Sequence, residues 1–196
     1  RKGNTPPLML HLKYQFYEKT VYSLLKKTIG IENGNFFPTA GAAVPDEICE
    51  FVHSVGINML VGYGLTESTA TVSCFQNSGY EIGSVGTVMP DVEVKIGENN
   101  EILLRGKTIT KGYYKKAEAT AEAIDKEGWF HTGDAGYLNG DCLYLTERIK
   151  DLFKTSNGKY ISPQALETKL AIDRYIDQIA IIADQRKFVS ALIVPM

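Results

Sequence analysis

The 196-residue sequence has few cysteines, little net charge and no long hydrophobic run, and each absence excludes a class of protein. Its three cysteines (Cys49, Cys74 and Cys142) lie far apart and form no CxxC pair. This spacing argues against a disulfide framework or a zinc site and suits a reducing cytosol, so we expect a cytoplasmic protein. The formal net charge of -2 gives no electrostatic reason to expect nucleic acid or an anionic membrane as a partner. No apolar stretch is long enough to cross a bilayer, so no transmembrane segment is predicted.

The first third of the chain predicts a parallel βαβ unit. Apolar residues recur at helical spacing over 14–29, and a short strand is expected at 36–37. A second helix is predicted over 45–55, because Pro45 suits a first helical position, and the apolar run 57–61 follows as the next strand. Ligands of such units gather beyond the carboxyl ends of the parallel strands.

The pattern changes to short alternating strands from about residue 81. The runs 92–96 and 101–105 predict a hairpin, and 136–138 and 143–145 predict another pair of strands. One helical insert is expected over 117–124. These features predict a β-rich, barrel-like section of mostly antiparallel strands.

After residue 148 the pattern is mixed again, with a predicted helix at 163–170 and a strand at 179–183. The fold class is therefore mixed α/β: a partial parallel βαβ layer, a β-rich barrel-like subdomain, and the start of a small α/β domain. We expect these three parts to cover 1–80, 81–148 and 149–196.

The stretch GYGLTEST, 62–69, places hydroxyl and carboxylate side chains directly after a predicted strand. Thr66 could bind a phosphate oxygen and Glu67 a Mg²⁺ ion, since Mg²⁺ is usually held by one or two carboxylates together with substrate phosphates. The alternative is a tight turn followed by a helix cap at Ser68 or Thr69.

The glycines of this stretch have a matching interpretation. Gly62 and Gly64 would let the backbone approach a ligand closely, and Tyr63 offers a flat face for a base. The segment 39–43 lies at the other strand end, so both segments are expected at one edge of the sheet.

A second candidate is WFHTGD, 129–134. An Asp in a turn, here Asp134, can accept hydrogen bonds from two neighbouring sugar hydroxyls, as acidic residues do for ribose in dinucleotide folds. The alternative is a turn Asp that caps its own backbone. His131 beside Asp134 suggests a hydrolytic triad only weakly, because the sequence has no G-x-S-x-G elbow.

A third candidate is the stretch from 148 to 159, where cations alternate with apolar residues before a Gly turn. Arg148, Lys150 and Lys154 could reach a phosphate or a sugar from an interdomain loop. The alternative is an edge strand protected by lysines.

Together these stretches carry a family resemblance. TAGAAVP, VGYGLTEST, EILLRGKTITKGYYKKAEAT, GWFHTGDAGYL and ERIKDLFKTSNGKYISPQALE follow one another in this order. Their order and spacing resemble the adenylate-forming (AMP-binding) enzyme superfamily, over nearly the whole chain from about residue 36. The loop SNGKYISPQ is similar to the one typical of long-chain fatty acid–CoA ligases.

The resemblance implies a nucleotide corner. Tyr63 would stack on adenine next to Gly64, Thr66 would touch the α-phosphate, and Glu67 would bind Mg²⁺. Three further residues would border the adenine and acyl pocket: Gly41, Ala42 and Ala43.

The resemblance also assigns residues of the later stretches. Asp134 would hold the ribose hydroxyls with Arg148 nearby, and Lys150 resembles the hinge residue about which the small domain swings. Lys154 belongs to the loop that helps to form the thioester-stage active site. The implied catalytic set is then Thr66, Glu67 and Lys154, with Lys150 among the nucleotide-binding residues.

The implied reaction uses a fatty acid, ATP, Mg²⁺ and coenzyme A. The carboxylate attacks the α-phosphorus of ATP, pyrophosphate leaves, and the thiol of coenzyme A then displaces AMP from the acyl-adenylate. Positioning and charge neutralisation should dominate the first step.

The sequence lacks two functional elements of the family pattern. We do not find the Ser/Thr/Gly-rich phosphate loop or the lysine of the adenylation step, so we expect a fragment that is inactive by itself. The alternatives are another acyl- or aryl-adenylating ligase, or a non-catalytic nucleotide-binding relative. The sequence assigns neither acyl chain length nor oligomeric state, and it leaves peripheral membrane contact of the parent enzyme open.

Overall fold

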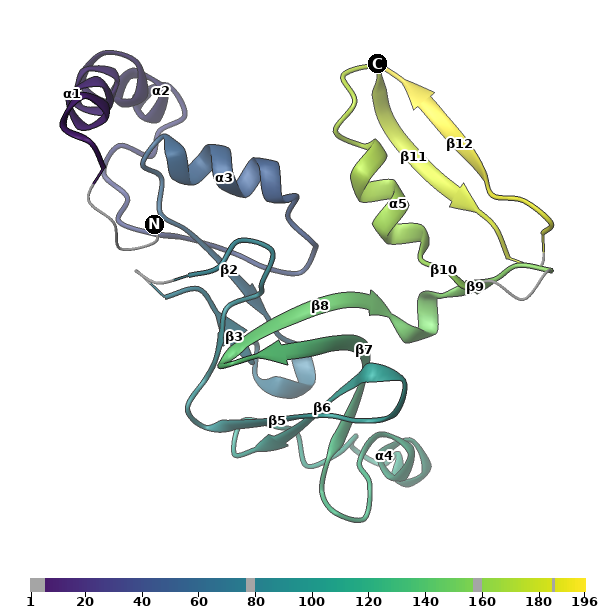
Figure 1. Ribbon diagram of the computed structural model, residues 1–196. Coiled ribbons are helices and arrows are strands. Elements are labelled where there is room, and N and C mark those ends of the chain that lie inside the picture. Colours follow the sequence, from purple (N-terminus) through teal and green to yellow (C-terminus); the bar gives the residue numbers. More distant parts are fainter. Residues whose placement is uncertain (1–5, 77–79, 157–159, 185) are drawn as a thin grey trace. The chain divides into compact units, whose positions relative to one another are not determined.

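The computed structural model describes residues 6–76, 80–156, 160–184 and 186–196, except for the side chain of Lys150 (Figure 1). The chain divides into two compact units, Arg1–Met89 and Pro90–Met196. The three-part division of the sequence stays a prediction. None of the described helices is long and apolar enough to span a membrane.

The first unit begins with a continuous helical segment that starts earlier than predicted. The helix α1 (Leu8–Tyr17) passes through a π-helical turn, Glu18–Tyr22, into α2 (Ser23–Thr28). The prediction missed the first turns because Leu8 to Leu12 is almost continuously apolar and carries no helical period.

The predicted parallel βαβ unit is confirmed. Strand β1 (Phe37–Thr39) pairs in parallel with β2 (Met59–Tyr63), and α3 (Asp46–Ser54) connects them. Pro45 lies immediately before α3, where its missing N–H costs nothing. The strands β3 (Ser73–Cys74) and β4 (Thr87–Val88) extend this sheet in the order β1-β2-β3-β4.

The core of the first unit lies between α3 and β2. Cys49 of α3, Val61 of β2 and Phe75 are buried together. The ring of Tyr80 stacks on Phe75 and on His53, with centroid distances of 5.1 and 4.2 Å. Burial also raises the pKa of the Cys49 thiol, with smaller contributions from neighbouring carboxylates, so this cysteine packs as a neutral apolar side chain.

The second unit contains an antiparallel sheet with the strand order β8-β7-β6-β5. Its strands are β5 (Val92–Ile96), β6 (Glu101–Gly106), β7 (Phe130–Asn139) and β8 (Cys142–Arg148). Within the described residues this sheet is open and does not close into a barrel. The predicted helical insert is α4 (Ala117–Ala123).

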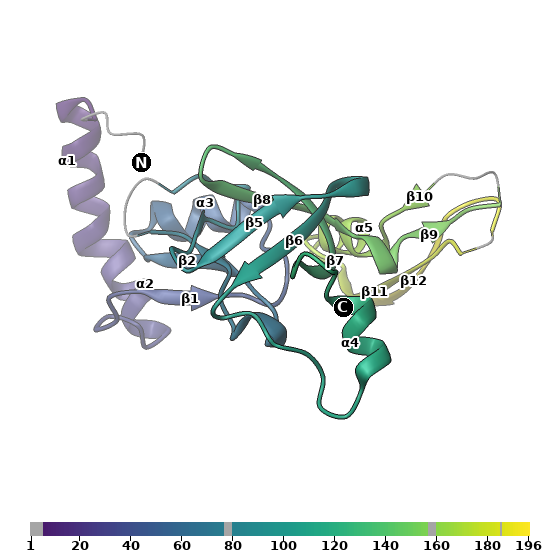
Figure 2. The same ribbon diagram turned by 90° about the horizontal axis from the view of Figure 1, so that it is seen from below.

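The last part of the second unit is a small α/β arrangement, as predicted (Figure 1 and Figure 2). Helix α5 packs against β11, and the Glu167 carboxylate accepts the N–H of Ile181 at 2.8 Å. The elements are η4 (Ile149–Asp151), β9 (Phe153–Lys154), β10 (Tyr160–Ile161), α5 (Pro163–Leu170), β11 (Ile176–Ile182) and β12 (Ser190–Pro195).

Three completely buried side chains form the centre of the antiparallel sheet: Ile102, Leu104 and Leu143. We expect Leu104→Ala to lower the free energy of unfolding by about 2–5 kcal/mol, because it leaves a cavity in this centre. Leu192, which is 65% exposed, is the matched control, and Leu192→Ala should cost about 0.5 kcal/mol. Urea denaturation measures both, and equal losses would contradict this description of the core.

Candidate functional site

Two of the predicted segments lie at one edge of the first sheet. The register pairs Phe37 with Met59 and Thr39 with Val61, so the parallel strands β1 and β2 end side by side. The segment 41–43 follows β1 and is exposed, and the segment 64–67 follows β2. The expectation that both gather beyond the carboxyl ends of parallel strands is therefore met.

The segment after β2 is a 3₁₀ turn, Thr66–Ser68, closed by a buried serine. Ser68 Oγ accepts the N–H of Leu65 and donates to the carbonyl oxygen of Leu65, both at 2.9 Å. Thr66 is exposed and Glu67 is half-buried. The tight turn of the alternative interpretation is thus present, and of its two candidate residues, Ser68 and Thr69, Ser68 closes it.

The space beside Gly64 is occupied by the chain itself. A Cβ at Gly64 would lie 1.6 Å from the carbonyl oxygen of Ala70, and one at Gly62 would lie 3.2 Å from that of Ser73. Both glycines therefore have a reason within the fold, apart from any ligand. Tyr63 is only 7% exposed, and its stacking role stays a prediction.

The segment 131–134 differs from its prediction, because it lies inside β7 and not in a turn. The register pairs Glu101 with Ala135 and Leu103 with His131, so β7 needs more residues than β6 over the same distance. Gly133 takes a φ of +74° at this place. The result is a bulge, a feature that commonly redirects side chains near functional sites.

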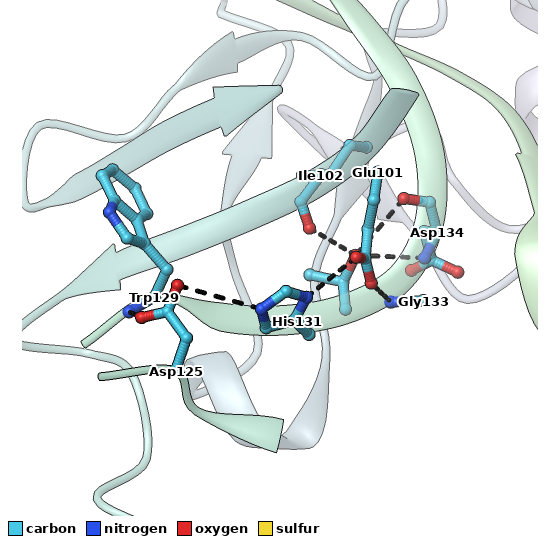
Figure 3. A network of polar contacts seen from close by, with 8 residues as sticks. Glu101, Ile102, Asp125, Trp129, His131, Gly133 and Asp134 are labelled. Atoms are coloured by element: carbon cyan, nitrogen blue, oxygen red, sulfur yellow. Dashed lines mark hydrogen bonds and ion pairs between the residues drawn. The ribbon is translucent and has the colours of Figure 1, made fainter. Parts of the chain in front are cut away.

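The hydroxyl of Thr132 forms hydrogen bonds with backbone groups at the bulge. It donates to the carbonyl oxygen of Ile102 at 2.7 Å and accepts the N–H of Asp134 at 3.0 Å (Figure 3). One side chain thus replaces ladder hydrogen bonds that the shifted register cannot form.

The carboxylate of Glu101 contacts two further residues of the bulge. Its Oε1 accepts the N–H of Gly133 at 2.9 Å, and its Oε2 lies 2.8 Å from Nδ1 of His131. The second nitrogen of His131, Nε2, lies 3.9 Å from Asp125 Oδ2 (Figure 3). Both imidazole nitrogens face carboxylates, so the arrangement gives no support to a hydrolytic triad.

Asp125 belongs to a tight turn before β7. The N–H of Trp129 donates to Asp125 Oδ1 at 2.8 Å, and this bond is the main cause that lowers the pKa of that carboxyl. The ring of Trp129, 8% exposed, carries the guanidinium of Arg105 at 4.4 Å from its centroid and Nζ of Lys95 at 5.5 Å. The turn is therefore held by both a hydrogen bond and cation–π contacts.

Asp134 and Arg148 are brought together. They are directly paired residues of β7 and β8, and Arg148 Nε lies 3.6 Å from Asp134 Oδ1 and 3.8 Å from Asp151 Oδ2. The Asp134 side chain is 14% exposed and that of Arg148 is 53% exposed. This places a partly buried carboxylate beside a cation.

The remaining predicted residues lie beyond β8. Lys154 is exposed in β9, with Nζ 5.6 Å from the ring centroid of Tyr160. The side chain of Lys150 and the loop residues 157–159 lie outside the described residues.

Metal binding was assigned by sequence to one carboxylate, that of Glu67. Across the described parts of the chain, no three or more His, Cys, Asp or Glu side chains are grouped so that they could hold a metal ion. One half-buried carboxylate at a strand end fits Mg²⁺ when substrate phosphates supply the other ligands, as is usual for this ion.

Two residues that hold the bulge were missed by sequence reasoning, namely Glu101 and Thr132. They carried no signal, since their partners lie across neighbouring strands, about 30 residues away. Ser68, in contrast, was named as one of the two cap residues of the alternative interpretation.

The comparisons with known proteins agree on one family. The model of the AMP-binding enzyme family matches residues 5–114. The long-chain-fatty-acid–CoA ligase FadD15 of Mycobacterium bovis is 33% identical over 96% of this chain and 31% of its own length. The chloroplastic long-chain-fatty-acid–[acyl-carrier-protein] ligase AEE15 of Arabidopsis thaliana is 30% identical over 91% of this chain and 27% of its own.

A solved structure supports the same assignment. The o-succinylbenzoate coenzyme A synthetase of Bacillus subtilis, in complex with ATP and a magnesium ion, superposes with a TM-score of 0.72 at 25% identity. The match covers 82% of this chain and 36% of that one. The chain spans about a third of the length of the curated relatives that it matches.

Gly64 provides the test of the corner after β2. Gly64→Ala would place a methyl group against a backbone carbonyl, so we expect a loss of about 2–3 kcal/mol in the free energy of unfolding. Gly30, with φ +77° and no atom within 4 Å of an added Cβ, is the control, and Gly30→Ala should cost only about 1 kcal/mol. If Gly64→Ala is no worse than Gly30→Ala, the close backbone approach is not present.

Proposed function

The chain belongs to the AMP-binding enzyme family, and we propose that it is part of an acid–thiol ligase that activates a fatty acid as its adenylate and transfers the acyl group to coenzyme A. The observation that carries this proposal is the similarity to a long-chain fatty acid–CoA ligase along 96% of the chain. The arrangement of three groups of candidate residues supports it.

The first group, Thr66 and Glu67, concerns the phosphate and the metal ion. Thr66 and Glu67 follow a strand end, one exposed and one half-buried, on a turn closed by Ser68. This places a hydroxyl and a carboxylate next to each other at the carboxyl end of β2. We assign Thr66 to the α-phosphate and Glu67 to Mg²⁺, which supplies neutralisation of phosphate charge. Gly41, Ala42 and Ala43 would border the same corner from the end of β1.

The second group, Asp134 and Arg148, concerns the ribose of the nucleotide. Asp134 is a partly buried carboxylate, and the Arg148 guanidinium lies 3.6 Å away, beyond normal hydrogen-bond length. Arg148 therefore places a positive charge beside this carboxylate. A carboxylate offers about four lone-pair sites, enough to accept two neighbouring ribose hydroxyls. We assign Asp134 to the ribose on this basis.

The third group, Lys154 and Lys150, concerns transfer of the acyl group to the thiol. Lys154 lies on the short strand β9, exposed and close to the ring of Tyr160, where its charge can reach an anionic substrate. We assign Lys154 to the thioester-forming stage and Lys150 to the hinge before it. In this stage the sulfur of the thiol attacks the carbonyl carbon of the acyl-adenylate, and the bond to AMP breaks.

The acyl acceptor and the acid define the alternatives. One similar protein is named as an acyl-carrier-protein ligase and another as an o-succinylbenzoate ligase, so both a carrier-protein thiol and an aryl acid belong in the test. A non-catalytic relative is the second alternative. Fatty acid, ATP and coenzyme A as substrates, and a cytoplasmic location, belong to the proposal as well.

The proposal is tested by ATP–pyrophosphate exchange in the complete gene product that contains residues 1–196, with acids from acetate to palmitate and one aryl acid. We expect exchange to be strongest with long chains, and coenzyme A to convert the adenylate to a thioester. If ATP–pyrophosphate exchange occurred with the aryl acid alone, the substrate class would be aryl acids and not fatty acids. No exchange with any acid in a folded protein would favour a non-catalytic relative.

Asp134 is tested in the same protein. Asp134→Ala removes two charge-assisted hydrogen bonds to the sugar, so we expect the KM for ATP to rise roughly tenfold or more, with the KM for the acid unchanged. Asp141→Ala, at the exposed tip of the β7–β8 hairpin, is the control and should leave both constants unchanged. Unchanged ATP kinetics in Asp134→Ala would remove this residue from the site.

A further inference from the structure

We propose that Glu101 is a positioning residue for Asp134. Its carboxylate holds the bulge of β7 in the form that sets where the Asp134 side chain lies. The inference rests on the proposed function for the role of Asp134, while the contacts that carry it belong to the structure.

The bulge creates a need for side-chain partners. Between the pairs Glu101–Ala135 and Leu103–His131, β7 carries more residues than β6, so backbone groups in between cannot all join the ladder. Gly133 is buried, and a buried N–H without a partner is costly. The N–H of Gly133 is paired with Glu101 Oε1 at 2.9 Å.

A carboxylate suits this place because it has two oxygens for two different groups. Oε1 accepts the Gly133 N–H, and Oε2 lies 2.8 Å from His131 Nδ1. The Glu101 side chain is only 20% exposed, so little water competes for these oxygens. The carboxylate thereby links the backbone of Gly133 to the side chain of His131, on either side of Thr132, and hydrogen bonds to a charged acceptor are the stronger kind.

The connection to Asp134 is direct. Gly133 precedes Asp134, and the N–H of Asp134 donates to Thr132 Oγ1. Thr132 in turn donates to the Ile102 carbonyl, the residue after Glu101. One short piece of β6 therefore fixes the backbone that leads into the proposed ribose ligand, and Figure 3 shows the contacts between β6 and β7 at this place.

Three variants of the complete gene product separate positioning from general stability. Glu101→Ala removes both contacts. Glu101→Gln keeps an oxygen for the Gly133 N–H and an amide that can donate to His131 Nδ1. Glu93→Ala is the control, since Glu93 also pairs with a side chain of the same sheet, Arg105 at 2.6 Å, but lies on β5, away from the bulge.

Two readouts are compared among these variants. In ATP–pyrophosphate exchange, Glu101→Ala should raise the KM for ATP roughly tenfold and leave the KM for the acid unchanged, because only the nucleotide ligand is displaced. Glu101→Gln and Glu93→Ala should stay within about threefold of the wild type. In hydrogen-exchange mass spectrometry, the peptide around 130–136 should exchange faster in Glu101→Ala alone.

The outcomes are decisive in each direction. An unchanged KM for ATP in Glu101→Ala would overturn the inference. Equal rises in the KM for ATP and for the acid, or a failure of Glu101→Gln to restore function, would overturn it too. If the wild type shows no ATP–pyrophosphate exchange with any acid, the proposed function fails by itself, and unaltered hydrogen exchange at 130–136 in Glu101→Ala would then separately refute the positioning role of Glu101.

Discussion

The constraint on which both candidate segments depend is that buried backbone groups need hydrogen-bond partners where regular pairing stops. After β2 the chain turns sharply, and Ser68 satisfies both the N–H and the carbonyl of Leu65. Inside β7 the register shifts, and Thr132 and Glu101 satisfy the groups that the ladder leaves out. In each case polar side chains pair backbone groups where the chain leaves regular geometry.

The same constraint explains why structural and ligand-facing residues alternate. Ser68 closes its turn and directly follows Glu67, the proposed metal ligand. Thr132 holds the bulge two residues before Asp134, the proposed ribose ligand. In both places the residue that satisfies the backbone lies within two positions of the residue proposed to bind the ligand. Rigid support from the residues next to the site is what preorganised binding requires.

The sequence predicts the regular elements well and the irregular ones badly. The hairpin 92–96 with 101–105 and the helix at 163–170 are confirmed because their periodicity is local. The two-residue strands β3 and β4 carry no readable period. The segment 131–134 reads as a turn from its Gly and Asp, yet it lies in a strand, because cross-strand contacts override local preference. Pairing of Asp134 with Arg148 depends on the register between β7 and β8, so the family resemblance placed the two residues near each other but local periodicity did not.

The packing of Trp129 has an optical consequence. It is the only tryptophan among the 196 residues, it is almost buried, and a guanidinium covers its ring. The intrinsic tryptophan fluorescence of this chain therefore originates at the residue that directly precedes β7, just before the bulge. Its emission wavelength reports the hydration of that single place, and melting of the first unit alone would leave no direct tryptophan signal.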